Sequence, residues 1–223
     1  MSVSLNKFVA ATGVCSRREA DRWIEAGRLT INGTVAVRGN RVEPGDRVML
    51  DGRPIGKQPE RVYLAFHKPA GVTCTTDPRD PDNIVDFIGY PERIFPVGRL
   101  DKASTGLIFL TNDGDVVNDV LRAEHEHEKE YIVTVDRPID DTFVRRMGGG
   151  LPILGKRTNR CTVERLGSRK FRIILTQGMN RQIRRMCEYL GYRVMTLKRV
   201  RIMDIELGDL PPGHFRVLTG FFA

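Results

Sequence analysis

One carboxylate, Asp101, stands in a polar loop near the middle of this 223-residue chain. The apolar segments 94–97 (Ile-Phe-Pro-Val) and 107–110 (Leu-Ile-Phe-Leu) flank the loop, and each reads as a short buried strand. Gly98 and Gly106 bracket the loop between them. An acid held between two rigid strands can act as a base or as a nucleophile. The same acid can equally cap a turn, and the spacing alone does not separate these readings.

A second polar cluster lies toward the C-terminus, where residues 178–201 carry seven Lys/Arg and one acid. From Gln182 onward the apolar spacing predicts a helix that buries Ile183, Met186, Cys187 and Leu190. Arg181 and Arg185 then point to the opposite side and Arg184 lies on the flank. This basic cluster is either a solvated surface or a surface that contacts an anion.

A third basic cluster lies near the N-terminus, where residues 4–27 read as two short helices. The second begins with Ser16 and Glu19, which match a capping box. Its outer face carries Arg17, Arg18 and Arg22, and these form either a solvated helix face or a phosphate-binding surface. The turn 32–33 (Asn-Gly) then predicts a hairpin of 29–31 with 35–37, and 42–50 reads as a further strand pair.

Composition favours a globular protein with an acidic partner. Apolar residues make up 40% and charged residues 29% of the chain, the net charge is +8 and the pI is near 9.6. A basic balance of this kind is most often matched by nucleic acid. No apolar run approaches the ~18 residues of a membrane span, and the N-terminus lacks a signal-peptide pattern.

The cysteines and histidines give no sign of a metal site or a disulfide framework. The four cysteines lie far apart, which predicts reduced core residues in a cytoplasmic protein. His125 and His127 have a spacing that could suit a metal, but no cysteine or second cluster lies nearby. We therefore expect no bound metal.

The chain divides at a stretch rich in glycine and proline, residues 52–61. We expect a small domain over 1–55, a linker over 56–61 and a second domain over 62–223. In the second domain we expect strands at 62–66, 128–135, 161–166, 171–176 and 194–201. Helices are expected at 140–148 and where Val116, Val117, Val120 and Leu121 share a face. The fold class is therefore α+β.

The sequence around Asp101, Gly-Arg-Leu-Asp-x-x-Ser-x-Gly-Leu over 98–107, resembles the central motif of RNA pseudouridine synthases. Three further family motifs follow the family order: Lys-Pro-x-Gly at 68–71, Lys-x-Tyr at 129–131, and Asn-Arg-Gln-Ile-Arg-Arg-Met at 180–186. Residues 1–55 resemble the S4 RNA-binding module. The whole pattern resembles the RsuA/RluF branch, which modifies ribosomal RNA, and 127–131 and 185–192 look most like the RluF type.

This resemblance implies a mixed, largely antiparallel sheet with a cleft, and the isomerisation of uridine to pseudouridine without a cofactor. The implied partner is ribosomal RNA of the 23S type, with a tRNA as a further substrate and no membrane, and we expect a monomer. Asp101 would be the catalytic acid, Arg184 its ion-pair partner and Tyr131 the platform for the flipped base. Arg99 would hold that nucleotide open. The other residues expected to bind RNA are Arg17, Arg18, Arg22, Lys129, Arg181 and Arg185.

Several alternatives stay open at this stage. Asp101 could attack the sugar or remove its C2′ proton. Tyr131 could simply fill the core. The chain could be a non-catalytic RNA-binding or ribosome-assembly protein, which would not need Asp101, Tyr131 and Arg184 together. A phosphate-ester enzyme would need metal ligands that the sequence does not suggest.

Overall fold

The computed structural model describes residues 2–116 and 127–219 and divides into two compact units. Unit 1 comprises 1–62 with the short segments 90–94 and 112–114, and unit 2 comprises 63–89, 95–111 and 115–223. Residues 117–121 of the expected helix, and His125, fall outside the described residues. The predicted domain boundary and linker remain a prediction. Residues of that linker contact segment 112–114, as Asn112 donates to the Glu60 carbonyl at 2.7 Å and Arg61 pairs with Asp113 at 3.2 Å.

Unit 1 packs two short helices against small sheets. Leu5, Val9, Ala20 and Ile24 of the helices are buried with Leu29 of the first hairpin. The elements of unit 1 are β1 Val3–Ser4, α1 Leu5–Ala11, α2 Arg17–Glu25, β2 Leu29–Ile31, β3 Thr34–Val35, β4 Arg41–Val42, β5 Val48–Leu50 and β6 Arg53–Ile55.

Local sequence signals set most of this unit. The Ser16 hydroxyl accepts a hydrogen bond from the Glu19 amide at 3.1 Å, as the capping box predicts. The predicted hairpin forms between β2 and β3. The expected strand pair within 42–50 is wrong, because β4 pairs with β1 whereas β5 pairs with β2 and β6. Strand order depends on distant partners, which residues 42–50 do not encode.

Unit 2 is built on a nine-stranded sheet in the order β13-β14-β10-β15-β9-β7-β17, with β16 beside β15 and β8 beside β9. All of its pairs are antiparallel except β15 with β9. The elements are β7 Tyr63–Lys68, α3 Ile84–Ile88, β8 Phe95–Val97, β9 Thr105–Thr111, β10 Lys129–Val135, α5 Asp141–Gly148, β11 Pro152–Ile153, β12 Lys156–Arg157, β13 Thr162–Gly167, β14 Lys170–Leu175, α6 Gln182–Tyr189, β15 Val194–Ile202, β16 Ile205–Glu206 and β17 Phe215–Val217.

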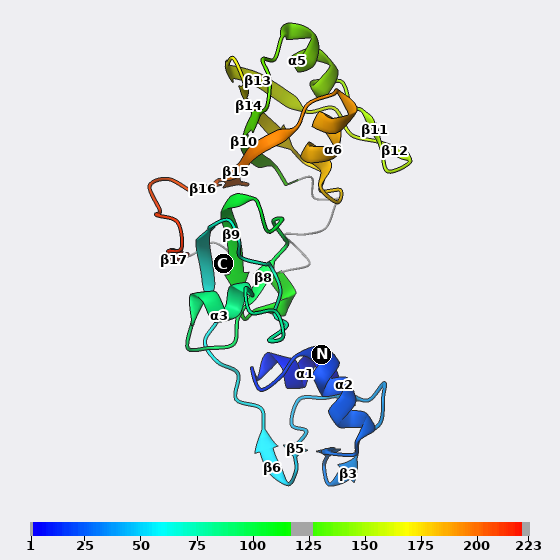
Figure 1. Cartoon of the computed structure of the whole chain (residues 1–223). Coiled ribbons are helices and arrows are strands. Elements are labelled where there is room, and N and C mark those ends of the chain that lie inside the picture. The colour runs from blue at the N-terminus through cyan, green and yellow to red at the C-terminus, as the bar shows by residue number, and fades with distance from the viewer. Residues whose placement is uncertain (1, 117–126, 220–223) are drawn as a thin grey trace. The chain divides into compact units, whose positions relative to one another are not determined.

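Helices cover separate parts of this sheet. Figure 1 shows α5 and α6 with β10, β13, β14 and β15, and their buried side chains share one core that includes Phe143, Phe171, Ile183 and Met186. The shorter α3 contacts β7, where the rings of Phe87 and Phe66 lie 6.0 Å apart. The α+β class and the mixed, largely antiparallel sheet are confirmed. The hairpin of β11 and β12 was not predicted.

The parallel junction between β15 and β9 depends on one glycine. Gly106 pairs with Arg199 in the register of the two strands and has φ +107°. A Cβ at this position would overlap the carbonyl oxygen of Arg199. Gly106 therefore lets the two backbones meet and brings the loop that precedes β9 close to β10 and β15.

None of the helices that the structure describes is long and apolar enough to cross a bilayer.

Candidate active site

The Asp101 loop runs from β8 to β9, and hydrogen bonds from a buried lysine hold it in place. The Lys68 ammonium donates to the carbonyl oxygens of Pro69 and Val72 at 2.8 Å each and to that of Lys102 at 3.3 Å. Lys68 has no exposed surface, and burial lowers the pKa of its ammonium. A buried cation needs such acceptors, so the lysine of the 68–71 motif joins the end of β7 to the residue that follows Asp101.

Three further contacts order the loop. The Leu100 amide donates to the Cys74 sulfur at 3.3 Å, and the Gly71 amide donates to the Lys102 carbonyl at 2.8 Å. Within the loop the Ser104 amide donates to the Asp101 carbonyl at 2.9 Å. The backbone of Asp101 is therefore held on both sides. The turn forms as expected, but the Asp101 carboxylate does not cap it, since it contacts Arg181 and Arg184 instead.

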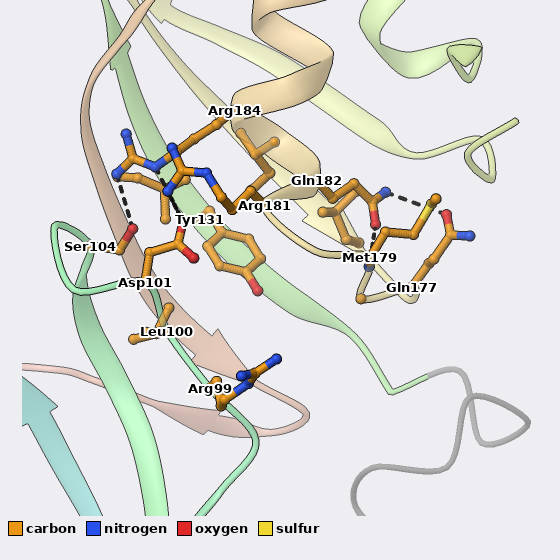
Figure 2. Close-up of a pocket in the computed structure, with 14 residues that line it drawn as sticks. Arg99, Leu100, Asp101, Ser104, Tyr131, Gln177, Met179, Arg181, Gln182 and Arg184 are labelled. Atoms are coloured by element: carbon orange, nitrogen blue, oxygen red, sulfur yellow. Dashed lines mark hydrogen bonds and ion pairs between the residues drawn. The ribbon is translucent and has the colours of Figure 1, made fainter. Parts of the chain in front are cut away.

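Two arginines approach the same oxygen of Asp101. Arg181 Nη1 lies 3.2 Å and Arg184 Nε lies 3.3 Å from Oδ2 (Figure 2). The Arg181 contact is a hydrogen bond, whereas the Arg184 N–H is not aligned for one and its contact is an ion pair. The Arg184 Nη2 donates instead to the buried Ser104 hydroxyl at 3.1 Å. The predicted contact between Arg184 and Asp101 is thus present, and its catalytic role remains a prediction.

The other carboxylate oxygen, Oδ1, accepts no hydrogen bond from any residue that the structure describes. The Asp101 side chain is 28% exposed, so this oxygen can meet a ligand. One oxygen anchors the carboxylate and the other is available for chemistry.

Tyr131 lies beside this carboxylate on β10 (Figure 2). Its ring lines the pocket and packs against the core of α5 and α6. The buried guanidinium of Arg199 lies 6.0 Å from the ring centroid, within the range of a cation–π contact. Tyr131 therefore packs against the core and also lines the pocket, and its role as a platform for the flipped base remains a prediction.

The pocket around these groups encloses about 460 Å³, part of it open to solvent. Its charged lining consists of Asp101 with Arg99, Arg181 and Arg184. Its apolar lining consists of Leu100, Leu175, Met179, Ile183 and Leu197, and its other polar groups include Ser104, Tyr131, Gln177 and Gln182.

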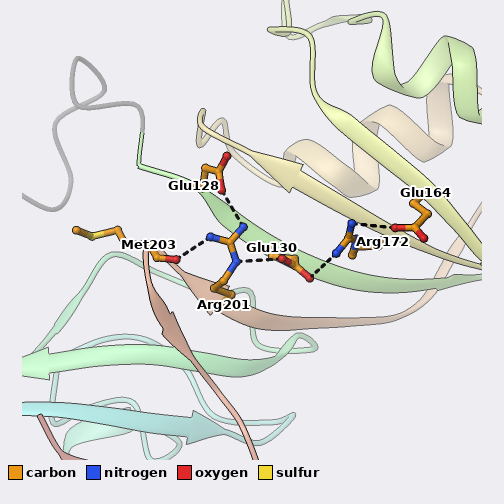
Figure 3. Close-up of polar contacts among 6 residues, drawn as sticks. All are labelled: Glu128, Glu130, Glu164, Arg172, Arg201 and Met203. Carbon is orange, nitrogen blue, oxygen red and sulfur yellow. Dashed lines mark hydrogen bonds and ion pairs between the residues drawn. The ribbon is translucent and has the colours of Figure 1, made fainter.

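A ladder of ion pairs lies behind Tyr131 on the other face of the sheet (Figure 3). Glu130 is 15% exposed and lies between Arg201 Nε at 3.0 Å and Arg172 Nη1 at 3.7 Å. Arg201 also contacts Glu128 at 2.8 Å and Arg172 contacts Glu164 at 2.9 Å. Glu128 and Glu130 raise the pKa of the Arg201 guanidinium. The ladder joins four strands where the register of β10 and β15 shifts, between residues 130 and 131.

The loop before α6 gives Arg181 its unusual position. Arg181 adopts the left-handed region with φ 51°, at the N-cap of α6. Arg185 donates to the carbonyl and the side-chain oxygen of Asn180 at 3.1 and 3.3 Å, and Gln182 accepts from the Met179 amide at 3.0 Å. Arg181 and Arg185 are expected on the side of the helix opposite its apolar face; in the structure Arg181 is 44% exposed and lines the pocket, and Arg185 is half-buried. Helical spacing does not apply to Arg181, which precedes the helix, and Arg185 folds back on the loop.

Of the remaining predicted residues, Arg99 and Lys129 belong to unit 2. Arg99 lines the pocket but points away from Asp101 and Arg184 (Figure 2). Lys129 does not line it, and its ammonium donates to the His127 carbonyl at 2.8 Å. Burial lowers the pKa of Lys129. In unit 1 the exposed Arg17, Arg18 and Arg22 lie on α2, and Arg22 pairs with Glu19 at 2.9 Å. Their RNA contacts remain predictions.

Sequence reasoning missed Ser104, Lys68, Gln182 and Arg199 as parts of the site. Ser104 and Lys68 belong to the recognised motifs, which is the signal that could have found them. Gln182 belongs to the 180–186 motif. Arg199 carried no local signal, because a charged residue in a strand reads as exposed whereas this one is 4% exposed and donates to the Leu107 carbonyl at 2.7 Å.

Metal ligands do not gather in the described ranges 2–116 and 127–219, where no three His, Cys, Asp or Glu side chains are placed to bind an ion. Within them all four cysteines are free thiols. Burial raises the pKa of Cys187 to about 12 and those of Cys15 and Cys161 to about 11. The thiols therefore offer no nucleophile at neutral pH.

Comparison with known proteins identifies the class. Residues 62–189 match the family model of RNA pseudouridylate synthases, and residues 3–48 match that of the S4 domain. A crystal structure of a pseudouridylate synthase superposes with a TM-score of 0.71 at 28% identity, over 97% of this chain and 96% of the other. The chain belongs to the RNA pseudouridine synthase family and is an RNA pseudouridine synthase.

Within that family the chain belongs to the RsuA/RluF branch. It is 52% identical over 220 residues to the dual-specificity RNA pseudouridine synthase RluF of Escherichia coli K12, over 98% of this chain and 76% of the relative. It is 32% identical to the ribosomal large subunit pseudouridine synthase B of Bacillus subtilis 168, over 96% of this chain and 91% of the relative. The predicted family and enzyme class are confirmed, and the non-catalytic alternative is excluded.

Proposed function

We propose that this enzyme isomerises one uridine of large-subunit (23S) ribosomal RNA, that a tRNA is a second substrate, and that Asp101 is the reacting acid. The observation that carries the choice of Asp101 is the arrangement of its two oxygens. Oδ2 is held by Arg181 and Arg184, whereas Oδ1 is open to the pocket beside Tyr131. The substrate assignment rests on the relatives named for dual specificity and for the large ribosomal subunit.

The reaction conserves every atom of the uridine. The N1–C1′ bond breaks, the uracil turns within the pocket, and C5 bonds to C1′ while the C5 proton is lost and N1 gains one. Asp101 acts on the ribose, either as a nucleophile at C1′ or as a base at the C2′ proton. Tyr131 supports the base outside the RNA stack, and Arg99 at the pocket mouth contacts the strand that the base leaves. Arg184 fixes the carboxylate, and no cofactor is needed.

The S4-like domain supplies RNA affinity in this proposal. In this proposal Arg17, Arg18 and Arg22 contact phosphates. Lys129 and Arg185, which lie in the catalytic domain, contribute further contacts to RNA. We further propose that the enzyme acts as a monomer in the cytoplasm and that the domains divide at the linker 56–61.

The decisive test is Asp101→Asn on RNA fragments from the large subunit and on tRNA. Pseudouridine has the mass of uridine, so the readout is a carbodiimide that marks pseudouridine and stops reverse transcription. We expect no turnover by this variant, with RNA affinity within a few fold of wild type. Asp209→Asn, at an exposed site, is the matched control and should be fully active. Turnover by Asp101→Asn would refute the assignment.

Two further measurements settle the finer points. A uridine deuterated at C2′ should react more slowly by a primary isotope effect if Asp101 acts as the base. It should react at nearly the normal rate if Asp101 attacks C1′. Activity on ribosomal RNA but not on any tRNA would refute the second substrate and leave the first.

A further inference from the structure

We propose that Arg181 is an exchangeable partner: it contacts Asp101 in the free enzyme and moves to a phosphate of the target nucleotide when RNA binds. This inference rests on the proposed role of Asp101. It changes the role of Arg181 from general RNA binding to one defined contact beside the reacting ribose.

Asp101 has two cationic partners, of which one is fixed in place and the other is free to move. Arg184 is 11% exposed and also donates to Ser104, so it is fixed in place. Arg181 is 44% exposed, and among the described residues its side chain pairs with Asp101 alone. Exposed ion pairs contribute only about 0–1 kcal/mol. Arg181 can therefore leave Asp101 at little cost, while Arg184 continues to hold the same oxygen.

The backbone conformation of Arg181 places its side chain at the pocket. A non-glycine residue in the left-handed region costs about 1–2 kcal/mol, and Arg181 adopts it with φ 51°. Arg185 and Gln182 brace the preceding loop on both sides. With this conformation the Arg181 side chain lies at the pocket beside Asp101, as Figure 2 shows. A general phosphate contact on a basic surface would not need it.

The net charge of the pocket lining also favours a phosphate contact. The pocket is lined by Arg99, Arg181 and Arg184 against the single acid Asp101, so its lining carries an excess of two positive charges. A neutral uracil ring does not compensate them, but the phosphates on either side of the target ribose do. A guanidinium binds a phosphate through two parallel hydrogen bonds, which is stronger than one bond to a carboxylate already shared with Arg184.

The phosphate that Arg181 contacts in this proposal lies next to the target ribose. Arg181 Nη1 is 3.2 Å from Asp101 Oδ2, and Asp101 acts on the target ribose. Only the phosphates bonded to that ribose, on its 5′ or 3′ side, come within reach of a side chain anchored there. Arg181 therefore positions the nucleotide, and its removal should weaken binding more than chemistry.

The test is a binding cycle with RNA carrying one neutral methylphosphonate, placed on the 5′ or the 3′ side of the target uridine. The proteins are wild type, Arg181→Met and the control Arg146→Met, which changes an exposed arginine of α5. For wild type we expect a loss of about 10–100-fold in affinity at one linkage, since hydrogen bonds to charged groups contribute about 1.5–3 kcal/mol. Arg181→Met should bind ordinary RNA with an affinity lowered by a similar factor. Its affinity should not fall further when that linkage carries the methylphosphonate. Arg146→Met should be as sensitive as wild type.

Two outcomes overturn the proposal. One is that the effects of Arg181→Met and the methylphosphonate add at both linkages. The other is that Arg181→Met binds normally but reacts slowly at saturating enzyme in a single turnover, which would make it a fixed partner of Asp101. The same cycle run with Asp101→Asn keeps the two proposals apart. If Asp101 is not the reacting acid, Asp101→Asn turns over, yet the binding cycle still reports on Arg181.

Discussion

The Arg184 guanidinium donates to the Ser104 hydroxyl at 3.1 Å while its Nε lies 3.3 Å from the Asp101 carboxylate. Residues 101 and 104 belong to one turn, closed by the Ser104 amide and the Asp101 carbonyl. One arginine from α6 is therefore fixed by two side chains of a single loop. This arrangement fixes the orientation of the Asp101 carboxylate in the pocket.

Arg184→Met should lower kcat by about 100-fold or more, because losing the partner of a partly buried charge costs roughly 3–5 kcal/mol before screening. Arg184→Lys should lie between this variant and wild type, since an ammonium cannot contact Asp101 and Ser104 with one planar fork. Single-turnover rates at saturating enzyme measure both, with Arg146→Met as the control. A normal rate with weaker binding would instead place Arg184 in the RNA footprint.

Ser104→Ala should lower kcat by about tenfold, the equivalent of a hydrogen bond of ~1.4 kcal/mol to a charged group. RNA affinity should stay unchanged, because Ser104 is 1% exposed and cannot reach RNA from the surface. Ser104→Thr keeps the hydroxyl and is the matched control. Equal activity of the Ala and Thr variants would show that the hydroxyl does not hold Arg184.

Replacing Arg17, Arg18 and Arg22 together by alanine should weaken RNA binding and flatten its dependence on salt. Each phosphate contact contributes about 0.7–0.9 to the slope of log K against log salt, so up to three contacts give a change of about 2–3. Arg22 shares its charge with Glu19, which places the expectation toward the lower value. Titrations at several salt concentrations measure this. An unchanged slope would make the cluster a solvated helix face.

Gly106→Ala should destabilise the fold by more than about 3 kcal/mol, through a steric clash added to an unfavourable backbone conformation. The new Cβ would meet the Arg199 backbone, and φ is +107°. Denaturant unfolding measures the change. Gly114→Ala is the control, since no other described segment of the chain has an atom within 4 Å of its Cβ position. Equal stability of the two variants would contradict the described junction of β9 and β15.

Glu130→Ala should lower the free energy of unfolding by about 2 kcal/mol, because it leaves the largely buried Arg201 and the partly exposed Arg172 without their shared acid. Glu164→Ala removes only an exposed end of the same ladder and should cost under ~1 kcal/mol. Thermal unfolding of both variants makes the comparison. Similar losses would mean that the central position of Glu130 between Arg172 and Arg201 has no special weight.

The family and the fold class could be predicted from the sequence, and so could the turn, strand and helix that carry the candidate site residues. The Asp101 turn, the alternation that exposes Tyr131 to one face of β10, and the apolar face of α6 are properties of short segments. Short segments carry their own signals, because side-chain periodicity and capping act over a few residues. The contact of Arg184 with Asp101 also followed, although through family resemblance and not through spacing.

The contacts within the candidate site could not be predicted from local patterns, because they join residues that lie far apart in the chain. Arg181 and Asp101 are separated by 80 residues, as are Arg184 and Ser104, and no local pattern reports such a pair. The inward turn of Arg181 follows from a left-handed backbone before the helix, where helical spacing has no meaning. Arg199 stays buried because β9 brings the Leu107 carbonyl to it, and Lys68 stays buried because the carbonyls of Val72 and of the distant Lys102 accept from its ammonium. A charge stays inside a protein only where other groups satisfy it.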